Sequence, residues 1–241
     1  RLCRDWSSDV CSSDLESLDF GLALKPDTIQ LGFLKMLHGS RLRAEAAALG
    51  YAHRRRPPYE ILGNPWLSFA ELCRLKVTAH LIDTYYNEGR FATSLPRLFA
   101  RAASPARFFA DVAAYSEEAG WHRRAHQARD LPGHLLAYAE RRDIADPVLR
   151  DRLRLDLHCL GRRDAEPPWA DVPAAPDLQN QWRAWLQSPE HRALLGPEFA
   201  ESGVRETLRR SRILAFRHDP TAPPEEGAPG DRKSTRLNSS H

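Results

Sequence analysis

Two short stretches of the sequence combine aromatic rings with polar groups that could bind a small molecule. PPYE (residues 57–60) holds the hydroxyl of Tyr59 and the carboxylate of Glu60 in a segment that its prolines should keep stiff and extended. YYNEGRF (residues 85–91) offers the polar and aromatic side chains Tyr85, Tyr86, Asn87 and Arg90. Aromatic walls with a few convergent polar groups are typical of small-molecule pockets. Ordinary packing and capping at a helix end is the alternative, and the residue types alone favour it.

No complete metal or nucleotide motif accompanies these stretches. His122 and His126 have the i, i+4 spacing that would direct both side chains of a helix at one metal ion, but no third ligand is apparent. We therefore interpret both as surface histidines beside Arg123 and Arg124. Neither phosphate-binding glycine loop, G-x-x-x-x-G-K-[ST] or G-x-G-x-x-G, occurs in the sequence, and neither does G-x-S-x-G.

The predicted secondary structure around residues 57–60 and 85–91 changes along the chain from an α/β pattern to a helical one. A helix should end before Pro26, and the alternation of apolar residues over 29–35 predicts a strand. Residues 40–49 predict a helix that Gly50 closes in the left-handed conformation. Helix, strand and helix in this order are typical of the last part of an α/β unit. The prolines of residues 54–66 predict an irregular segment after it.

From Ser68 onward the pattern is helical. Ser68 and Glu71 form a capping box at the start of a helix that Gly89 ends. Polar caps close to prolines predict further helices that begin after Ser104, Asp130 and Asp146. Shorter helices are expected over 178–187 and 189–195, a last strand over 212–218, and a flexible linker over 221–230.

The two ends of the chain can be encoded by the same DNA sequence read on opposite strands. A permitted choice of codons for residues 231–241 has a reverse complement that, from its third base, translates as DWSSDVCSSD, which is residues 5–14. Two natural protein segments have no physical reason for this relation. We therefore interpret residues 1–15 and 231–241 as translated sequencing-adapter DNA and expect both to be disordered. The natural part, residues 16–230, is then expected to be a fragment of a longer chain.

Composition limits the partners of that natural part. Cys73 and Cys159 are isolated from each other, which favours a reducing, cytoplasmic compartment, and we expect Cys73 to lie in the core. The formal net charge is +3 for the whole chain and +2 for the natural part, spread in short basic runs, so a nucleic-acid partner is not expected. No stretch approaches the length and apolarity of a membrane span.

Three phrases in a fixed order carry a family resemblance. They are LKPDTIQLGFLKMLHGSRLRAEAAALGY (residues 24–51), PPYEIL (57–62) and LCRLKVTAHLIDTYYNEGRF (72–91). Together they resemble the C-terminal portion of cobalamin-binding radical SAM proteins. In that family a cobalamin-binding Rossmann-like domain is followed by a radical SAM partial barrel and then by a helical domain of uncharacterised function.

The resemblance implies a mostly α fold class, with the C-terminal remnant of an α/β partial barrel followed by a multi-helix domain. Residues 16–66 would be the barrel edge and residues 67–220 the helical domain. Residues 29–35 would form a late barrel strand, with Gln30 or Lys35 facing the reaction chamber.

The resemblance also implies the cofactors of the parent enzyme, which are a [4Fe–4S] cluster, S-adenosylmethionine and cobalamin. The C-x3-C-x2-C loop that holds the cluster is absent from this sequence, as is the cobalamin-binding region. Both are expected in upstream domains of the same parent chain, which would be the partners of this fragment. The fragment itself is then expected to hold no cofactor and to be inert, and its small-molecule substrate is not identified.

Two other functions stay open at this stage. The chain could be a stand-alone helical binding module without catalysis, in which residues 24–49 are simply its own α/β edge. A weaker hypothesis is an RNA-binding helical domain, whose affinity for RNA would fall as salt rises.

Overall fold

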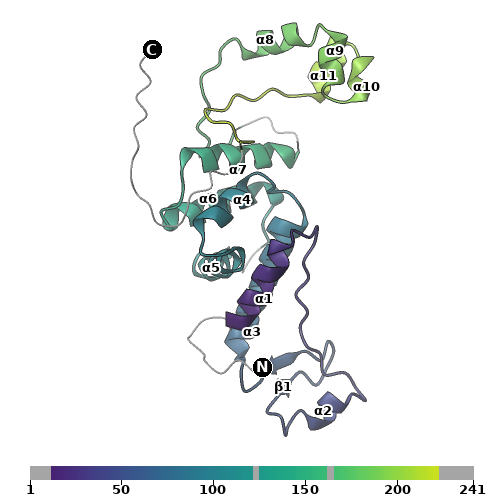
Figure 1. The fold of residues 1–241 in the computed structure, drawn as a ribbon, viewed down its shortest axis with the longest axis vertical. Coiled ribbons are helices and arrows are strands. Elements are labelled where there is room, and N and C mark those ends of the chain that lie inside the picture. Colours follow the sequence, from purple (N-terminus) through teal and green to yellow (C-terminus); the bar gives the residue numbers. More distant parts are fainter. Residues whose placement is uncertain (1–11, 122–124, 162–165, 223–241) are drawn as a thin grey trace.

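The computed structural model describes residues 12–121, 125–161 and 166–222, which form a mostly helical protein with one small sheet (Figure 1). The longer helices are α1 (Ser12–Ala23), α3 (Phe69–Ile82), α4 (Ser94–Arg101), α5 (Pro105–Glu118), α6 (Leu131–Arg141), α7 (Pro147–Cys159) and α8 (Leu178–Trp185). The shorter helices are α2 (Arg41–Glu45), η1 (Asp83–Asn87), η3 (Ala128–Asp130), α9 (Pro189–Ala193), α10 (Pro197–Ala200) and α11 (Val204–Arg210). Strands β1 (Ala52–His53) and β2 (Ile61–Gly63) make up the sheet. The predicted mostly α fold class is confirmed.

The helix starts that depend on local capping are confirmed. The Ser68 hydroxyl accepts a hydrogen bond from the Glu71 backbone N–H at 3.3 Å, and the Glu71 carboxylate accepts one from the Ser68 N–H at 2.8 Å. The side chains of Ser104 and Asp146 each accept one backbone N–H at the starts of α5 and α7, and a proline stands in the first turn of both. Helix α6 begins after Asp130 as predicted, but the Asp130 side chain does not cap it. Such caps satisfy backbone N–H groups that a helix cannot bond internally.

The main hydrophobic core lies between the central helices. Helix α5 packs against α1 and α3, while α7 packs against α4 and α6. Phe108 and Phe109 are fully buried, and Phe99 meets both rings edge to face with centroids 5.4 and 5.7 Å away. The Phe108 ring also meets Tyr138 of α6 at 5.6 Å. Aromatic contacts therefore join three helices around one centre.

A second, smaller core lies at the N-terminal end of α3. Met36, Ile61 and Leu72 pack together there, which attaches the sheet to the helical part. Strands β1 and β2 pair antiparallel within residues 52–63. The prediction that residues 54–66 lack regular structure is therefore wrong at β2, because the two prolines of residues 57–58 fall between the strands rather than within them.

Residues 29–35 do not form the predicted strand. Only Lys35 makes a β-bridge, antiparallel to Glu60. The alternating pattern required a neighbouring strand, but the backbone of Ile29 is hydrogen-bonded to the side chain of Asn87 instead.

The helix predicted over residues 40–49 is shorter than expected. The Ser40 side chain caps α2, which ends at Glu45, and residues 46–50 form turns. Gly50 has the predicted left-handed conformation, with φ of +71°.

The part that follows α7 departs further from the prediction. Helices α8 and α9 are confirmed, whereas α10 and α11 were not predicted. Figure 1 shows α8, α9, α10 and α11 gathered at one end of the molecule, beyond α7. Residues 212–218 form no strand, because side chains of α7 bind their backbone. Arg154 donates to the Ala215 carbonyl at 2.6 Å, and Asp151 accepts from the His218 N–H at 3.0 Å.

Several other predictions concern single residues or the ends. Cys73 is half-buried rather than in the core, and Cys159 is exposed. Helix α1 begins at Ser12, so residues 12–15 depart from the disorder expected there, while residues 1–11 and 231–241 lie outside the described residues. Within the described part of the chain, no helix has the length and apolarity to span a membrane.

Candidate functional site

A cavity of about 510 Å³ lies between α3 and η1 on one side and Trp121, η3 and α6 on the other. Its polar and aromatic lining consists of Lys76, His80, Thr84, Tyr85, Glu88, Arg90, Ser116, Trp121, His126 and His134. Leu81, Leu131 and neighbouring apolar side chains complete it. We refer to this cavity as the α3–α6 pocket. Its volume is typical of cavities that bind small molecules.

Helix α3 and η1 form one wall of the α3–α6 pocket. Lys76 and His80 are one helical turn apart, so both reach the same face of α3. At Asp83 the helix widens into the π-helical turn η1, in which the Glu88 N–H donates to the Asp83 carbonyl at 3.2 Å. This wider turn directs the buried Tyr85 ring into the pocket lining. Single π turns of this kind are frequent at functional sites.

One indole and two imidazoles form the opposite wall. The rings of Trp121 and His134 are stacked, with centroids 4.1 Å apart and planes inclined by 17°. His126 meets His134 edge to face at 4.4 Å, and its Nε2 lies 2.9 Å from the Trp121 carbonyl oxygen. Tyr115 of α5 supports the Trp121 ring from the core side at 5.1 Å. The rings therefore restrain one another before any ligand binds.

The rim of the α3–α6 pocket carries two ion pairs. Lys76 pairs with Glu60, and Arg90 pairs with Glu88. The hydrogen bond from Lys76 lowers the pKa of Glu60, so this carboxylate is ionised at neutral pH. Burial raises the pKa of Tyr85, so its phenol stays neutral. The pocket therefore offers cations that already have partners, a neutral hydroxyl and a flat aromatic wall. Such a lining suits a planar molecule that carries a few polar groups.

Of the predicted site residues, the structure brings three to this pocket. Tyr85 and Arg90 line it, and Glu60 contacts the lining residue Lys76. Tyr86 and Asn87 instead attach the segment before residue 30 to η1. The Tyr86 hydroxyl donates to the Pro26 carbonyl at 2.7 Å. Both residues therefore have structural partners rather than a place in the α3–α6 pocket.

The remaining predicted residues lie elsewhere. Tyr59 packs edge to face on His38 at 4.9 Å, and the Arg43 guanidinium lies 5.1 Å from its ring centroid. The φ of +59° at Tyr59 shows a turn rather than the extended conformation predicted for PPYE. Gln30 and Lys35 are exposed. Neither lines the α3–α6 pocket.

Sequence reasoning missed most of the aromatic wall. Trp121 and His134 belong to no local motif and meet only because α5 and α6 pack together. The interpretation of His126 as a surface residue is wrong, since its side chain is half-buried against His134. His122 lies outside the described residues. The i, i+4 spacing of Lys76 and His80 is a local signal that could have identified two of the missed lining residues.

A separate buried network stabilises the far side of α7. The Arg154 side chain is only 2% exposed and makes two hydrogen bonds to the Glu166 carboxylate, at 2.7 and 2.9 Å. These bonds and a contact with His158 lower the pKa of Glu166 to about 2, with the Arg154 hydrogen bond as the largest cause. Burial lowers the pKa of His158. This network links α7 to two loops and contributes to folding rather than to the α3–α6 pocket.

The fold and the α3–α6 pocket define a helical domain with a ligand-sized cavity. The chain belongs to the family described as Protein of unknown function (DUF4080), whose model matches residues 47–233. That range includes the sheet and every helix from α3 onward. No curated protein and no solved structure matches the chain.

Proposed function

We propose that this chain is the C-terminal part of a cobalamin-dependent radical SAM enzyme and that the α3–α6 pocket binds part of the enzyme's small-molecule substrate. The proposal rests on the resemblance of residues 24–51, 57–62 and 72–91 to that family. Membership of a family of unknown function is compatible with the helical domain of uncharacterised function that the resemblance implies.

The distribution of exposed apolar side chains supports the proposal most directly. Nine large apolar residues are exposed in the described part of the chain, and six of them fall between residues 20 and 69. These six are Phe20, Leu24, Leu34, Leu37, Leu49 and Phe69. Concentrated exposed apolar surface is typical of a contact with another protein surface. The upstream barrel of the parent chain would cover these side chains, because all of them except Phe69 belong to residues 16–66, which the resemblance assigns to the barrel edge.

The residues of this chain do not fit the cluster of the parent enzyme. The sequence has no C-x3-C-x2-C loop, and the described residues contain no group of three or more histidine, cysteine or acidic side chains arranged to hold a metal. In the parent, the cluster and S-adenosylmethionine would supply the radical. We assign no step of that chemistry to this chain, and its role in the proposal is to bind and orient the substrate.

The test uses the parent protein with its upstream domains, purified and reconstituted with iron and sulfide under anaerobic conditions. We expect reductive cleavage of S-adenosylmethionine. In the Trp121→Ala variant, cleavage without substrate should continue, while substrate-dependent product should fall by at least tenfold because one wall of the pocket is lost. Trp185→Ala, on α8 and outside the α3–α6 pocket, is the matched control and should keep product formation. A parent that binds no iron or does not cleave S-adenosylmethionine would refute the enzyme assignment. Unchanged product formation by the Trp121→Ala variant would refute the role of the pocket.

One observation favours the stand-alone binding module. Met36 and Ile61 share a core with Leu72 of α3, so the N-terminal part has packing of its own within this chain. Native-state hydrogen exchange separates the two functions. A barrel remnant predicts much weaker protection of backbone N–H groups in residues 29–63 than in α3, whereas a complete module predicts equal protection.

A further inference from the structure

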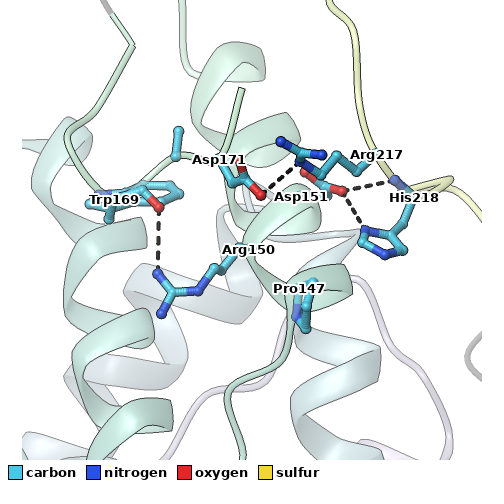
Figure 2. Close-up of a pocket in the computed structure, with 8 residues that line it drawn as sticks. Pro147, Arg150, Asp151, Trp169, Asp171, Arg217 and His218 are labelled. Carbon is cyan, nitrogen blue, oxygen red and sulfur yellow. Dashed lines mark hydrogen bonds and ion pairs between the residues drawn. The ribbon is translucent and has the colours of Figure 1, made fainter. Parts of the chain in front are cut away.

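A second cavity, of about 390 Å³, lies against the N-terminal half of α7. Figure 2 shows side chains from three segments around it, which are α7, residues 169–171 and residues 217–218. Trp169 and Arg150 lie on one side, His218 lies on the other, and Asp171 and Arg217 lie between them. The α3–α6 pocket shares none of these residues.

His218 is held in a defined orientation by a buried carboxylate. The Asp151 side chain is only 4% exposed, and its Oδ2 accepts from both the Nδ1 and the backbone N–H of His218 at 3.0 Å. An ionised carboxylate only accepts, so Nδ1 carries the proton and Nε2 remains for another partner. The His218 side chain is 41% exposed, which makes its ring accessible to a ligand in the cavity.

Two guanidinium groups also line this cavity, beside the carboxylates of Asp151 and Asp171. Arg150 donates to the Trp169 carbonyl at 3.4 Å and pairs with Glu140. Arg217 pairs with Asp171 at 2.7 Å, and both of these side chains are more than half exposed. An exposed ion pair contributes little free energy, so a ligand can replace Asp171 as the partner of Arg217 at small cost. A guanidinium also has more N–H groups than these contacts use.

We propose that this cavity binds a small molecule through an oxyanion group, either phosphate or carboxylate. Arg150 and Arg217 provide N–H donors for the oxyanion, since guanidinium groups match the geometry of both groups. The exposed ring of His218 forms part of the cavity wall and contacts the same ligand. The apolar part of the ligand contacts Trp169 and Pro147. The site lies wholly within this chain and does not depend on the radical SAM assignment.

The test is calorimetric titration of the chain with phenyl phosphate and, separately, with benzoate. For ligands of this size we expect a dissociation constant on the order of 1 mM. Arg150→Gln should weaken binding about tenfold, because a charged hydrogen-bond donor is lost. His218→Gln should weaken it as well. Arg41→Gln, an exposed arginine with an i, i+4 acidic partner on α2, is the matched control and should bind as the unaltered chain does. Circular dichroism checks that each variant is folded.

The two ligands distinguish the source of the oxyanion. Tighter binding of phenyl phosphate indicates a phosphate ester, and tighter binding of benzoate indicates a carboxylate. Binding of either with the expected losses supports the site. Absence of saturable binding by both ligands would overturn it, as would equal binding by the unaltered chain and the folded Arg150→Gln and His218→Gln variants. If Arg150→Gln does not fold, Arg217→Gln replaces it. The same loss of affinity is expected, and binding equal to that of the unaltered chain would again overturn the site.

Discussion

The carboxamide of Asn87 makes two hydrogen bonds to the backbone of Ile29. Its Oδ1 accepts from the Ile29 N–H and its Nδ2 donates to the Ile29 carbonyl, both at 2.8 Å. One side chain thus satisfies the two groups that a neighbouring strand would otherwise bind. The extended segment before residue 35 is therefore attached to η1 without a sheet around it.

Asn87→Ala should destabilise the chain. Both backbone groups of Ile29 would lose their partner, and we expect a loss of about 1–3 kcal/mol in the free energy of unfolding. Urea denaturation measures it. Asn180→Ala is the matched control, since Asn180 is exposed and bonds only locally to Asp177. Equal stability of the two variants would show that the Asn87 bonds contribute nothing.

Phe108→Ala should destabilise the chain by about 3–5 kcal/mol, because it removes a fully buried ring that contacts Phe99, Phe109 and Tyr138. Phe20→Ala makes the same chemical change at a ring that is 70% exposed, and should cost less than about 0.5 kcal/mol. Thermal or urea unfolding of both variants tests the position of the main core. Similar losses at the two positions would place the core elsewhere.

Glu166→Gln should remove stability in a pH-dependent way. The folded state lowers the pKa of Glu166 from 4.5 to about 2, so its contribution is fully present above pH 4.5 and is lost as the pH falls towards 2. We expect the variant to be less stable by about 3 kcal/mol at pH 7, because Arg154 would be left buried without its carboxylate.

Urea unfolding of the variant and the unaltered chain at pH 7 and pH 3 checks this expectation. The difference between them should be smaller at pH 3. Glu206→Gln, in an exposed pair with Arg209, is the control and should change stability by less than about 0.5 kcal/mol. A difference that does not vary with pH would contradict the pKa assigned to Glu166.

The double variant Leu24→Ser/Leu37→Ser should leave the stability of this chain almost unchanged but should destabilise the parent. Both side chains are more than half exposed here, so the double variant should lose less than about 0.5 kcal/mol and bind less hydrophobic dye. In the parent, where the barrel would cover them, the same change should cost about 2 kcal/mol or more. Leu194→Ser, at a residue that is 76% exposed on the α8–α11 side, should be neutral in both. If the double variant does not change the stability of the parent, the proposal that the barrel covers these side chains is refuted.

Local chemistry explains which elements could be predicted from the sequence. Ser68, Ser104 and Asp146 satisfy nearby backbone N–H groups, so each helix start is encoded within four residues. The failures involve distant partners. The alternation over residues 29–35 and the apolar run within residues 212–218 are typical of strands, but neither pattern reveals whether a second strand lies beside them. Asn87 and the side chains of α7 occupy those places instead.

The candidate site shows the same limit. Tyr85 and Arg90 were predicted because they are close in sequence and combine an aromatic ring with a charge. Trp121 and His134 were not, because only the packing of α5 and α6 brings them to that cavity. Tyr86 and Asn87 have the same residue chemistry as their neighbours but face the segment before residue 30. The sequence shows which chemical groups these side chains carry. The direction in which each side chain points depends on the π turn of η1.

The most direct test of the central proposal is the DNA sequence upstream of the codon for Glu16, read from an unsheared contig of the source genome. The account predicts that the reading frame continues upstream into a radical SAM domain with a C-x3-C-x2-C loop and, before it, a cobalamin-binding domain. A start codon immediately before Glu16, or a continuous upstream frame without that cysteine loop, would contradict it.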